Sequence, residues 1–207
     1  MFTDTTVRAF LDQLASKAPT PGGGSVAALT GALGAGLISM VCNLTIGKEK
    51  FKDVEADVKD ILARSEALRS RLMDLIDEDV AAYGKLSAAY KLPRATDDDK
   101  KARTAAIQAA LLDATAVPVS IAEACSQTID LCIPAAEKGN VGAISDIGVA
   151  VLLAEAGLRS ADLNVMINLS SIKDQAFVAR TRAHADSLRA GKSELKDKIV
   201  VEVEAKL

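Results

Sequence analysis

Apolar residues recur at helical spacing along almost the whole chain. The first run, Val7–Leu14, follows Thr5 and Thr6, either of which suits the N-cap of a helix. It ends before residues 18–24, where two prolines and three glycines exclude a helix. A second run, over about 25–46, is apolar on all sides, and small residues recur in it every four positions. The pattern predicts a short helix, a tight loop and a buried central helix that another backbone can approach closely.

The third run is a long heptad pattern with one polar interruption. It extends from about Asp53 to Leu92, and Pro93 ends it. Asp79 stands in the apolar seam where a leucine is expected. Because an unpaired buried carboxylate is strongly destabilising, Asp79 must have a partner or a function. It either fixes the register of the helices or binds a ligand and handles a proton.

The rest of the chain continues in helical patterns. A fourth helix, capped by Thr96 and three aspartates, is expected to run to about residue 137, with interruptions at Pro118 and Pro134. Another is expected over about 145–168, and a single last helix from about Asp174 to the C-terminus. No alternation typical of strands is present. The pattern predicts an all-α fold, a single-domain helical bundle with long helices over residues 1–207.

Composition narrows the classes of protein that fit. Apolar residues make up 49% of the chain and aromatic residues 3%, without tryptophan, so the core must consist of aliphatic side chains and alanine. The net charge of −3 and the lack of a basic stripe give no reason to expect nucleic-acid binding. No charge occurs between Ser25 and Gly47, which is long enough for a membrane span, but five polar residues and four glycines favour a buried helix over a membrane segment.

The N-terminus lacks the basic and apolar segments of a secretory signal, so a cytoplasmic location is expected. Three cysteines without a CxxC pair, and the single His184, argue against a disulfide framework and a zinc site. We therefore expect neither metal nor cofactor. The small-residue rows of the central helix also suit packing against a second copy of the chain in a dimer.

Several polar positions are candidates for a site, each with a simpler structural explanation. The loop 19–25 leads into a helix N-terminus, where free N–H groups favour an anion or an electron-rich ligand atom, although Ser25 can also simply cap the helix. Lys48 either caps the end of the central helix or meets a carboxylate in a cleft. Asp146 is an N-cap or a ligand contact, and Asn164 lies four residues before Asn168 on one helical face.

Five segments, in this order, resemble the cyclodeaminase family: Pro19–Phe51, Asp79–Tyr83, Pro118–Cys125, Gly139–Ala150 and Asn164–Leu169. Together they span nearly the whole chain. The family includes the C-terminal domain of formiminotransferase-cyclodeaminase and stand-alone methenyltetrahydrofolate cyclohydrolases. The chain is similar in length to the stand-alone proteins, and it most resembles those of methylotrophic bacteria.

The resemblance implies an all-α, dimeric enzyme that binds a folate near the glycine-rich loop. The expected activity is reversible hydrolysis of 5,10-methenyltetrahydrofolate to 10-formyltetrahydrofolate. The alternatives are a formiminotetrahydrofolate cyclodeaminase, which releases ammonia, and a folate-binding helical protein without catalysis. The expected catalytic residues are Asp79 and Lys48. The expected substrate-binding residues are Pro21, Gly22, Gly23, Gly24, Ser25, Asn140, Asp146 and Asn164.

Overall fold

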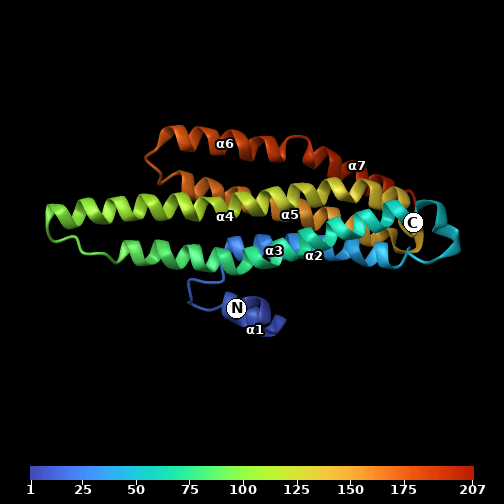
Figure 1. The fold of residues 1–207 in the computed structure, drawn as a ribbon, viewed down its shortest axis with the longest axis horizontal. Coiled ribbons are helices and arrows are strands. Elements are labelled where there is room, and N and C mark those ends of the chain that lie inside the picture. The colour runs from blue at the N-terminus through green and yellow to red at the C-terminus, as the bar shows by residue number, and fades with distance from the viewer.

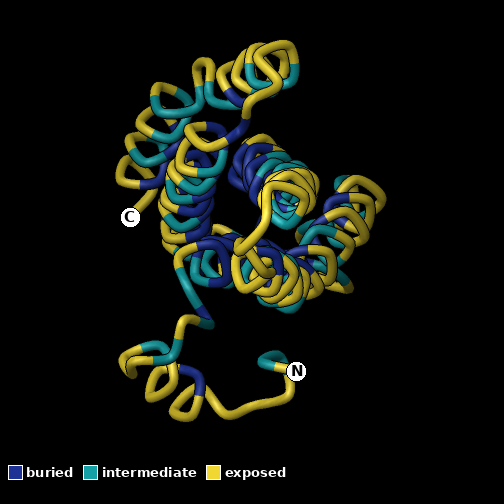
Figure 2. Tube along the Cα trace, turned by 90° about the vertical axis from the view of Figure 1, so that its left-hand side faces the viewer, coloured by how far each residue is buried: buried dark blue, intermediate teal, exposed yellow.

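Four long helices pack side by side around an aliphatic core (Figures 1 and 2). The computed structural model describes all residues, 1–207. The four helices are α2 (Gly23–Asn43), α3 (Glu55–Tyr90), α4 (Asp97–Lys138) and α5 (Ile144–Leu169). Both α2 and α4 pack against α3 and α5, so the order around the bundle is α2, α3, α4, α5. The all-α prediction is confirmed.

Shorter elements surround the bundle. They are η1 (Phe2–Asp4), α1 (Val7–Leu14), η2 (Glu49–Val54), η3 (Val141–Ala143), α6 (Gln175–Arg189) and α7 (Lys192–Glu204). Helices α6 and α7 pack along α4 and α5. Helix α1 stands apart from the bundle in Figure 1, and Phe10 is its one buried residue. The chain before it is fixed to α3, because the Phe2 N–H and the Thr3 hydroxyl both donate to Asp77 at 2.8 Å.

Two helix predictions were wrong. Helix α4 is not interrupted at Pro118 or Pro134 but continues through both. The expected last helix is two helices, because Gly191 adopts a φ of +73°, a conformation that favours glycine and ends the helical path between α6 and α7. The predicted caps at Thr6 and Thr96 are confirmed, since the hydroxyl of Thr6 accepts from an N–H of α1 and Thr96 forms a reciprocal capping box with Asp99. The N-caps of α2 and α5 are Gly22 and Ala143, so neither Ser25 nor Asp146 is an N-cap.

The small residues of α2 are required by close helix packing. A methyl group added at Gly31 would lie 2.5 Å from the Cys125 sulfur of α4. One added at Gly157 of α5 would lie 2.9 Å from the same sulfur and 3.1 Å from the Ala27 carbonyl oxygen. Three helices therefore meet around one thiol, and any side chain at these two glycines would push them apart.

The heptad seam of α3 faces the core over most of its length. Val58, Ile61, Leu72 and Leu75 are buried, as the pattern predicts, whereas Asp79 is only partly buried. Beyond Asp79 the seam opens, since Ala89 is the only later residue of α3 that is buried. The carboxylate thus stands where the bundle changes from closed to open.

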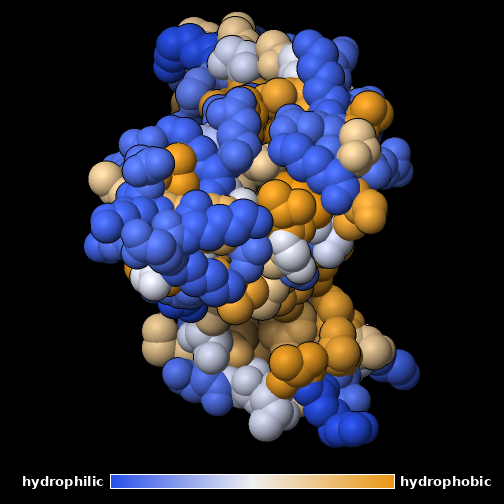
Figure 3. Space-filling view, turned by 90° about the vertical axis from the view of Figure 1, so that its right-hand side faces the viewer, coloured by the Kyte–Doolittle hydropathy of each residue, from blue (hydrophilic) through white to orange (hydrophobic).

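Apolar side chains also remain on the surface. The segments Gly23–Asn43, Asp97–Lys138 and Val141–Leu169 have the length and apolar composition of membrane-crossing helices. Seen from the end of the bundle that holds the C-terminus, apolar patches lie among hydrophilic side chains (Figure 3). On α2, Leu33 and Met40 are exposed, as is Leu44 directly after it, and Leu33 keeps 54% of its surface accessible.

Candidate active site

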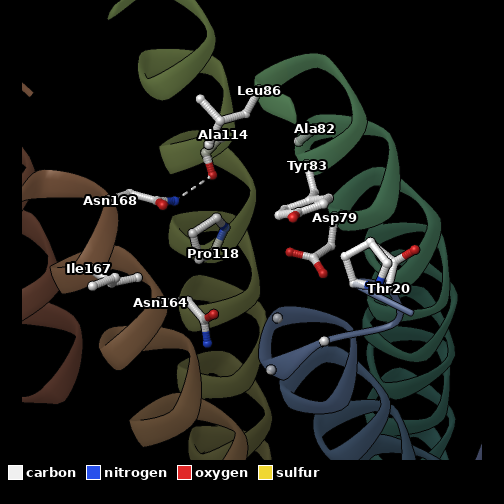
Figure 4. A pocket seen from close by; sticks show the side chains of 14 residues that line it. Thr20, Asp79, Ala82, Tyr83, Leu86, Ala114, Pro118, Asn164, Ile167 and Asn168 are labelled. Carbon is white, nitrogen blue, oxygen red and sulfur yellow. Dashed lines mark hydrogen bonds between the residues drawn. The ribbon is translucent and has the colours of Figure 1, made fainter. Parts of the chain in front are cut away.

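A cavity of about 310 Å³ opens at the N-terminal end of α2 (Figure 4). Its volume falls within the range of small-molecule sites. Loop residues preceding α2 form one wall, and α3, α4 and α5 form the others. The lining residues are Pro19, Thr20, Gly22, Gly23, Gly24, Asp79, Ala82, Tyr83, Leu86, Ala114, Pro118, Asn164, Ile167 and Asn168.

The carboxylate of Asp79 lies directly against the first turn of α2. The hydroxyl of Ser25, which is fully buried, donates to Asp79 Oδ2 at 2.8 Å. A methyl group at position 24 would lie 2.1 Å from Asp79 Oδ1, so only glycine leaves room for the carboxylate there. The glycine-rich loop thus allows the backbone of α2 to approach an acidic side chain of another helix.

Two opposing effects act on the pKa of Asp79. Burial raises this pKa above the ordinary value of 3.8, and hydrogen bonds from the Ser25 hydroxyl and N–H partly offset the rise. The positive end of the α2 dipole also favours a negative charge here. The outcome is a partly buried carboxyl group with a raised pKa, which is typical of groups that exchange protons with a ligand.

The walls beside Asp79 combine flat and polar groups. Tyr83 of α3 and Pro118 of α4 project into the cavity from neighbouring walls in Figure 4. Asn164 and Asn168 project from α5, one helical turn apart. The arrangement suits a flat, partly polar molecule that carries positive charge or hydrogen-bond donors near the carboxylate.

Comparison with known proteins identifies the family. The family model for formiminotransferase-cyclodeaminase matches residues 6–187. The chain belongs to this family. The expectation drawn from the sequence segments is therefore confirmed.

Members of the formiminotransferase-cyclodeaminase family resemble the chain to different extents. It is 50% identical, over the full length of both chains, to the methenyltetrahydrofolate cyclohydrolase of Methylorubrum extorquens. It is 37% identical over 89% of its length to the rat formimidoyltransferase-cyclodeaminase, and spans 34% of that longer protein. The crystal structure of formiminotetrahydrofolate cyclodeaminase from Thermotoga maritima aligns with a TM-score of 0.88 and 28% identity, covering 99% of this chain and 98% of that one.

The structure brings one group of the predicted site residues together at the cavity. Gly22, Gly23, Gly24, Asp79 and Asn164 all line the cavity. Pro21 does not line it, and the neighbouring Pro19 and Thr20 do.

The predicted contact of Ser25 with a ligand has to be corrected. Its side chain is fully buried and its hydroxyl is directed at Asp79, so it supports the carboxylate from behind.

A second group of predicted residues lies at the opposite end of α2. Lys48 follows that end, and the 21 residues of α2 separate it from Gly24 by roughly 30 Å. Asn140 is nearby, because its N–H donates to the Thr45 hydroxyl at 2.9 Å. Asp146 is in the first turn of α5 after η3. Within one chain, the two expected catalytic residues, Lys48 and Asp79, are therefore far apart.

Sequence reasoning missed several lining residues. Tyr83 and Pro118 lie inside the segments that resemble the family, but neither has a side chain that indicates chemistry by itself. Asn168 was detectable from its spacing to Asn164, although the spacing alone does not separate a ligand contact from a structural bond.

Proposed function

We propose that this protein is a 5,10-methenyltetrahydrofolate cyclohydrolase, which hydrolyses its substrate reversibly to 10-formyltetrahydrofolate. Identity of 50% over the full length to a cyclohydrolase of that name supports this function most directly. The cavity supports it chemically, because it places a carboxylate beside a space suited to a flat cationic ring system.

Asp79 is the residue best placed to act on the reacting carbon. Methenyltetrahydrofolate carries a cationic amidinium carbon between N5 and N10, and a nearby carboxylate stabilises that charge. Water adds to this carbon while Asp79 takes one of its protons. Asp79 then returns the proton to N5 as the bond between carbon and N5 breaks. The remaining hydroxyl loses its proton to solvent and becomes the formyl carbonyl on N10.

Absorbance provides the test of this function. Purified protein is added to methenyltetrahydrofolate, and the loss of near-ultraviolet absorbance is compared with that caused by boiled protein and by the Asp79→Asn variant. We expect rapid loss with the wild type and at least a 100-fold slower rate with Asp79→Asn, because general acid–base catalysis contributes about 10²- to 10⁴-fold. A wild-type rate equal to that of boiled protein would refute the proposal.

A cyclodeaminase is the alternative, favoured by the name of the Thermotoga maritima structure and by the rat relative. Ammonia release from formiminotetrahydrofolate would select it. Folate binding without either turnover would select a binding protein.

We also propose that the protein forms a homodimer through the outer surface of α2. Leu29, Leu33 and Leu37 of α2 line an apolar groove of about 420 Å³ with Met73 of α3 and Leu153 of α5. Because α2 has no charged residue, this surface suits an identical surface better than solvent. Two copies related by a two-fold axis across α2 would bury both grooves.

This dimer would also reunite the two groups of predicted site residues. A two-fold axis perpendicular to α2 sets the two copies of α2 antiparallel. The end that carries Lys48 in one copy then approaches the end that carries Gly24 and Asp79 in the other. We propose that the complete site includes Lys48 and Asp146 of the second copy.

The dimer and its composite site are tested separately. Leu33→Arg should give a monomer in analytical ultracentrifugation, whereas Val201→Arg, at an exposed position of α7, should remain a dimer. A monomeric wild type, or one that sediments with lipid vesicles, would contradict the dimer.

For the composite site, inactive Asp79→Asn and Lys48→Ala proteins are unfolded, mixed in equal amounts and refolded. Random pairing makes about half of the dimers heterodimers, and each heterodimer has one intact site and one site that lacks both residues. Activity should therefore recover to about a quarter of the wild-type value. No recovery would refute a composite site.

A further inference from the structure

Two asparagines of α5 have their amide orientation fixed by the backbone. Asn164 Nδ2 donates to the Ser160 carbonyl at 2.8 Å. Asn168 Nδ2 donates to the Ala114 carbonyl at 3.1 Å, the bond drawn in Figure 4. A carbonyl oxygen only accepts hydrogen bonds, so the NH₂ group of each side chain must face it. Each Oδ1 atom is therefore directed elsewhere.

The bond made by Asn168 has a specific cause. Pro118 lies inside α4 and has no backbone N–H, so the Ala114 carbonyl, four residues earlier, lacks its ordinary helical donor. Asn168 supplies that donor from the neighbouring helix. Proline, carbonyl and amide together set the position of Asn168 at the wall of the cavity.

Both amide oxygens are left without a partner in the protein. Neither Asn164 Oδ1 nor Asn168 Oδ1 accepts a hydrogen bond, although both residues line the cavity. Asp79 on α3 adds carboxylate oxygens to the same space. The second N–H of each amide also has no partner, but it lies on the nitrogen that faces a backbone carbonyl. The oxygen atoms of Asn164, Asn168 and Asp79 are all acceptors, so the ligand surface that meets these oxygens carries donors.

We infer that Asn164 and Asn168 accept hydrogen bonds from the donor edge of the substrate's reduced pterin ring. This edge carries the 2-amino group and ring N–H groups. The inference rests on the proposed function and assigns the orientation of the substrate within the cavity. The pterin edge lies against α5, and the amidinium carbon lies towards Asp79. Asp146, also expected to bind the substrate, is at the far end of α2 in the same chain, so in the proposed dimer it reaches this cavity only from the second copy.

The main test pairs Asn164→Leu with a substrate analogue that has a methyl group in place of the 2-amino group. Leucine has a similar shape and removes the acceptor, and the Ser160 carbonyl keeps its helical donor, the N–H of residue 164. For the natural substrate, KM should rise about 5- to 10-fold, as expected for one lost hydrogen bond, while kcat changes less than about 2-fold. For the wild type, KM for the analogue should exceed KM for the natural substrate by a similar factor. For Asn164→Leu, the two KM values should be equal.

Asn168 is tested with a compensating substitution. Asn168→Leu leaves the Ala114 carbonyl without a donor, whereas the double variant Asn168→Leu with Pro118→Ala restores a backbone N–H in α4. The double variant should recover the wild-type Tm but keep the raised KM, and Pro118→Ala alone provides its reference. Gln127→Leu, at an exposed position of α4 away from the cavity, should keep the wild-type KM.

The outcomes separate this inference from the proposed function. If replacing the substrate by the analogue raises KM by the same factor in the wild type and in Asn164→Leu, the asparagines do not bind the pterin edge, although the proposed function stands. If the double variant regains both Tm and KM, Asn168 is purely structural and its part in the inference fails. If the wild type neither turns over methenyltetrahydrofolate nor binds 5-formyltetrahydrofolate in a titration, the function fails and the inference with it.

Discussion

The contact between Gly24 and Asp79 gives the sharpest prediction about the site. In a Gly24→Ala variant, the new methyl group would lie 2.1 Å from Asp79 Oδ1 and 2.6 Å from Asp79 Cγ. Such overlap cannot persist, so the carboxylate must swing away from α2 and lose its bond from Ser25. The first turn of α2 is itself held by packing against α3 and α5, so the side chain moves rather than the helix.

The magnitude follows from three effects. Overpacking costs about 1–3 kcal/mol, and the lost hydrogen bond adds about 0.5–1.5 kcal/mol. The better helix propensity of alanine returns at most about 1 kcal/mol. We expect a net destabilisation of roughly 0.5–4.5 kcal/mol. Because the carboxylate is displaced by an ångström or more, kcat/KM should fall about 100-fold.

Gly84→Ala is the matched control. Gly84 lies in α3, the helix that carries Asp79, and an added methyl group meets nothing within 4 Å. This variant should keep the wild-type activity and gain up to about 1 kcal/mol of stability, which raises Tm by about 2–4 °C. Urea unfolding and the absorbance assay measure both quantities. A Gly24→Ala enzyme with the wild-type kcat/KM would show that the position of Asp79 against α2 has no part in catalysis.

Three further predictions concern protonation, packing and thiol chemistry. Because burial raises the pKa of Asp79, the stability of the wild type should fall relative to Asp79→Asn as the pH rises above 3.8 and through the raised pKa; parallel stability curves in urea would contradict this. Asn168→Leu should lower stability by about 1–3 kcal/mol, because the Ala114 carbonyl loses its donor, and adding Pro118→Ala should restore most of it; an unchanged Tm in the single variant would refute the account. Burial raises the pKa of Cys125 to about 12, so this thiol should not react with a chromogenic disulfide reagent until the protein is unfolded, and labelling in the native state would contradict its burial.

Helical periodicity predicted most of the fold because the long helices carry continuous apolar seams. It failed where the decisive contact was between helices. The break at Pro118 was expected because a proline removes a local hydrogen bond, but Asn168, fifty residues later, satisfies the freed carbonyl. The turn at Gly191 was missed because the polar C-terminal segment has no seam whose interruption would mark it.

The sequence predicted those site residues that interrupt a regular helical pattern. Asp79 interrupts a leucine seam and the glycine-rich loop interrupts a helix, so both are visible in the sequence. Lys48 and the glycine-rich loop lie in the same segment that resembles the family, Pro19–Phe51, but the 21 residues of α2 place Lys48 at the other end of the bundle. Proximity along the chain does not indicate proximity in a structure built from long helices.

Helix α1 has a consequence for local unfolding. Phe10 is the one buried residue of α1. The chain is held to the bundle mainly by the preceding turn, which forms hydrogen bonds with Asp77 of α3. Little buried surface opposes its opening, so its amide protons should exchange with deuterium through local fluctuations that leave the bundle intact. The amides of α2, which packs against three other helices, should exchange only when the whole domain unfolds. A protease that cuts within α1 would therefore act on the native population, long before the chain loses its core.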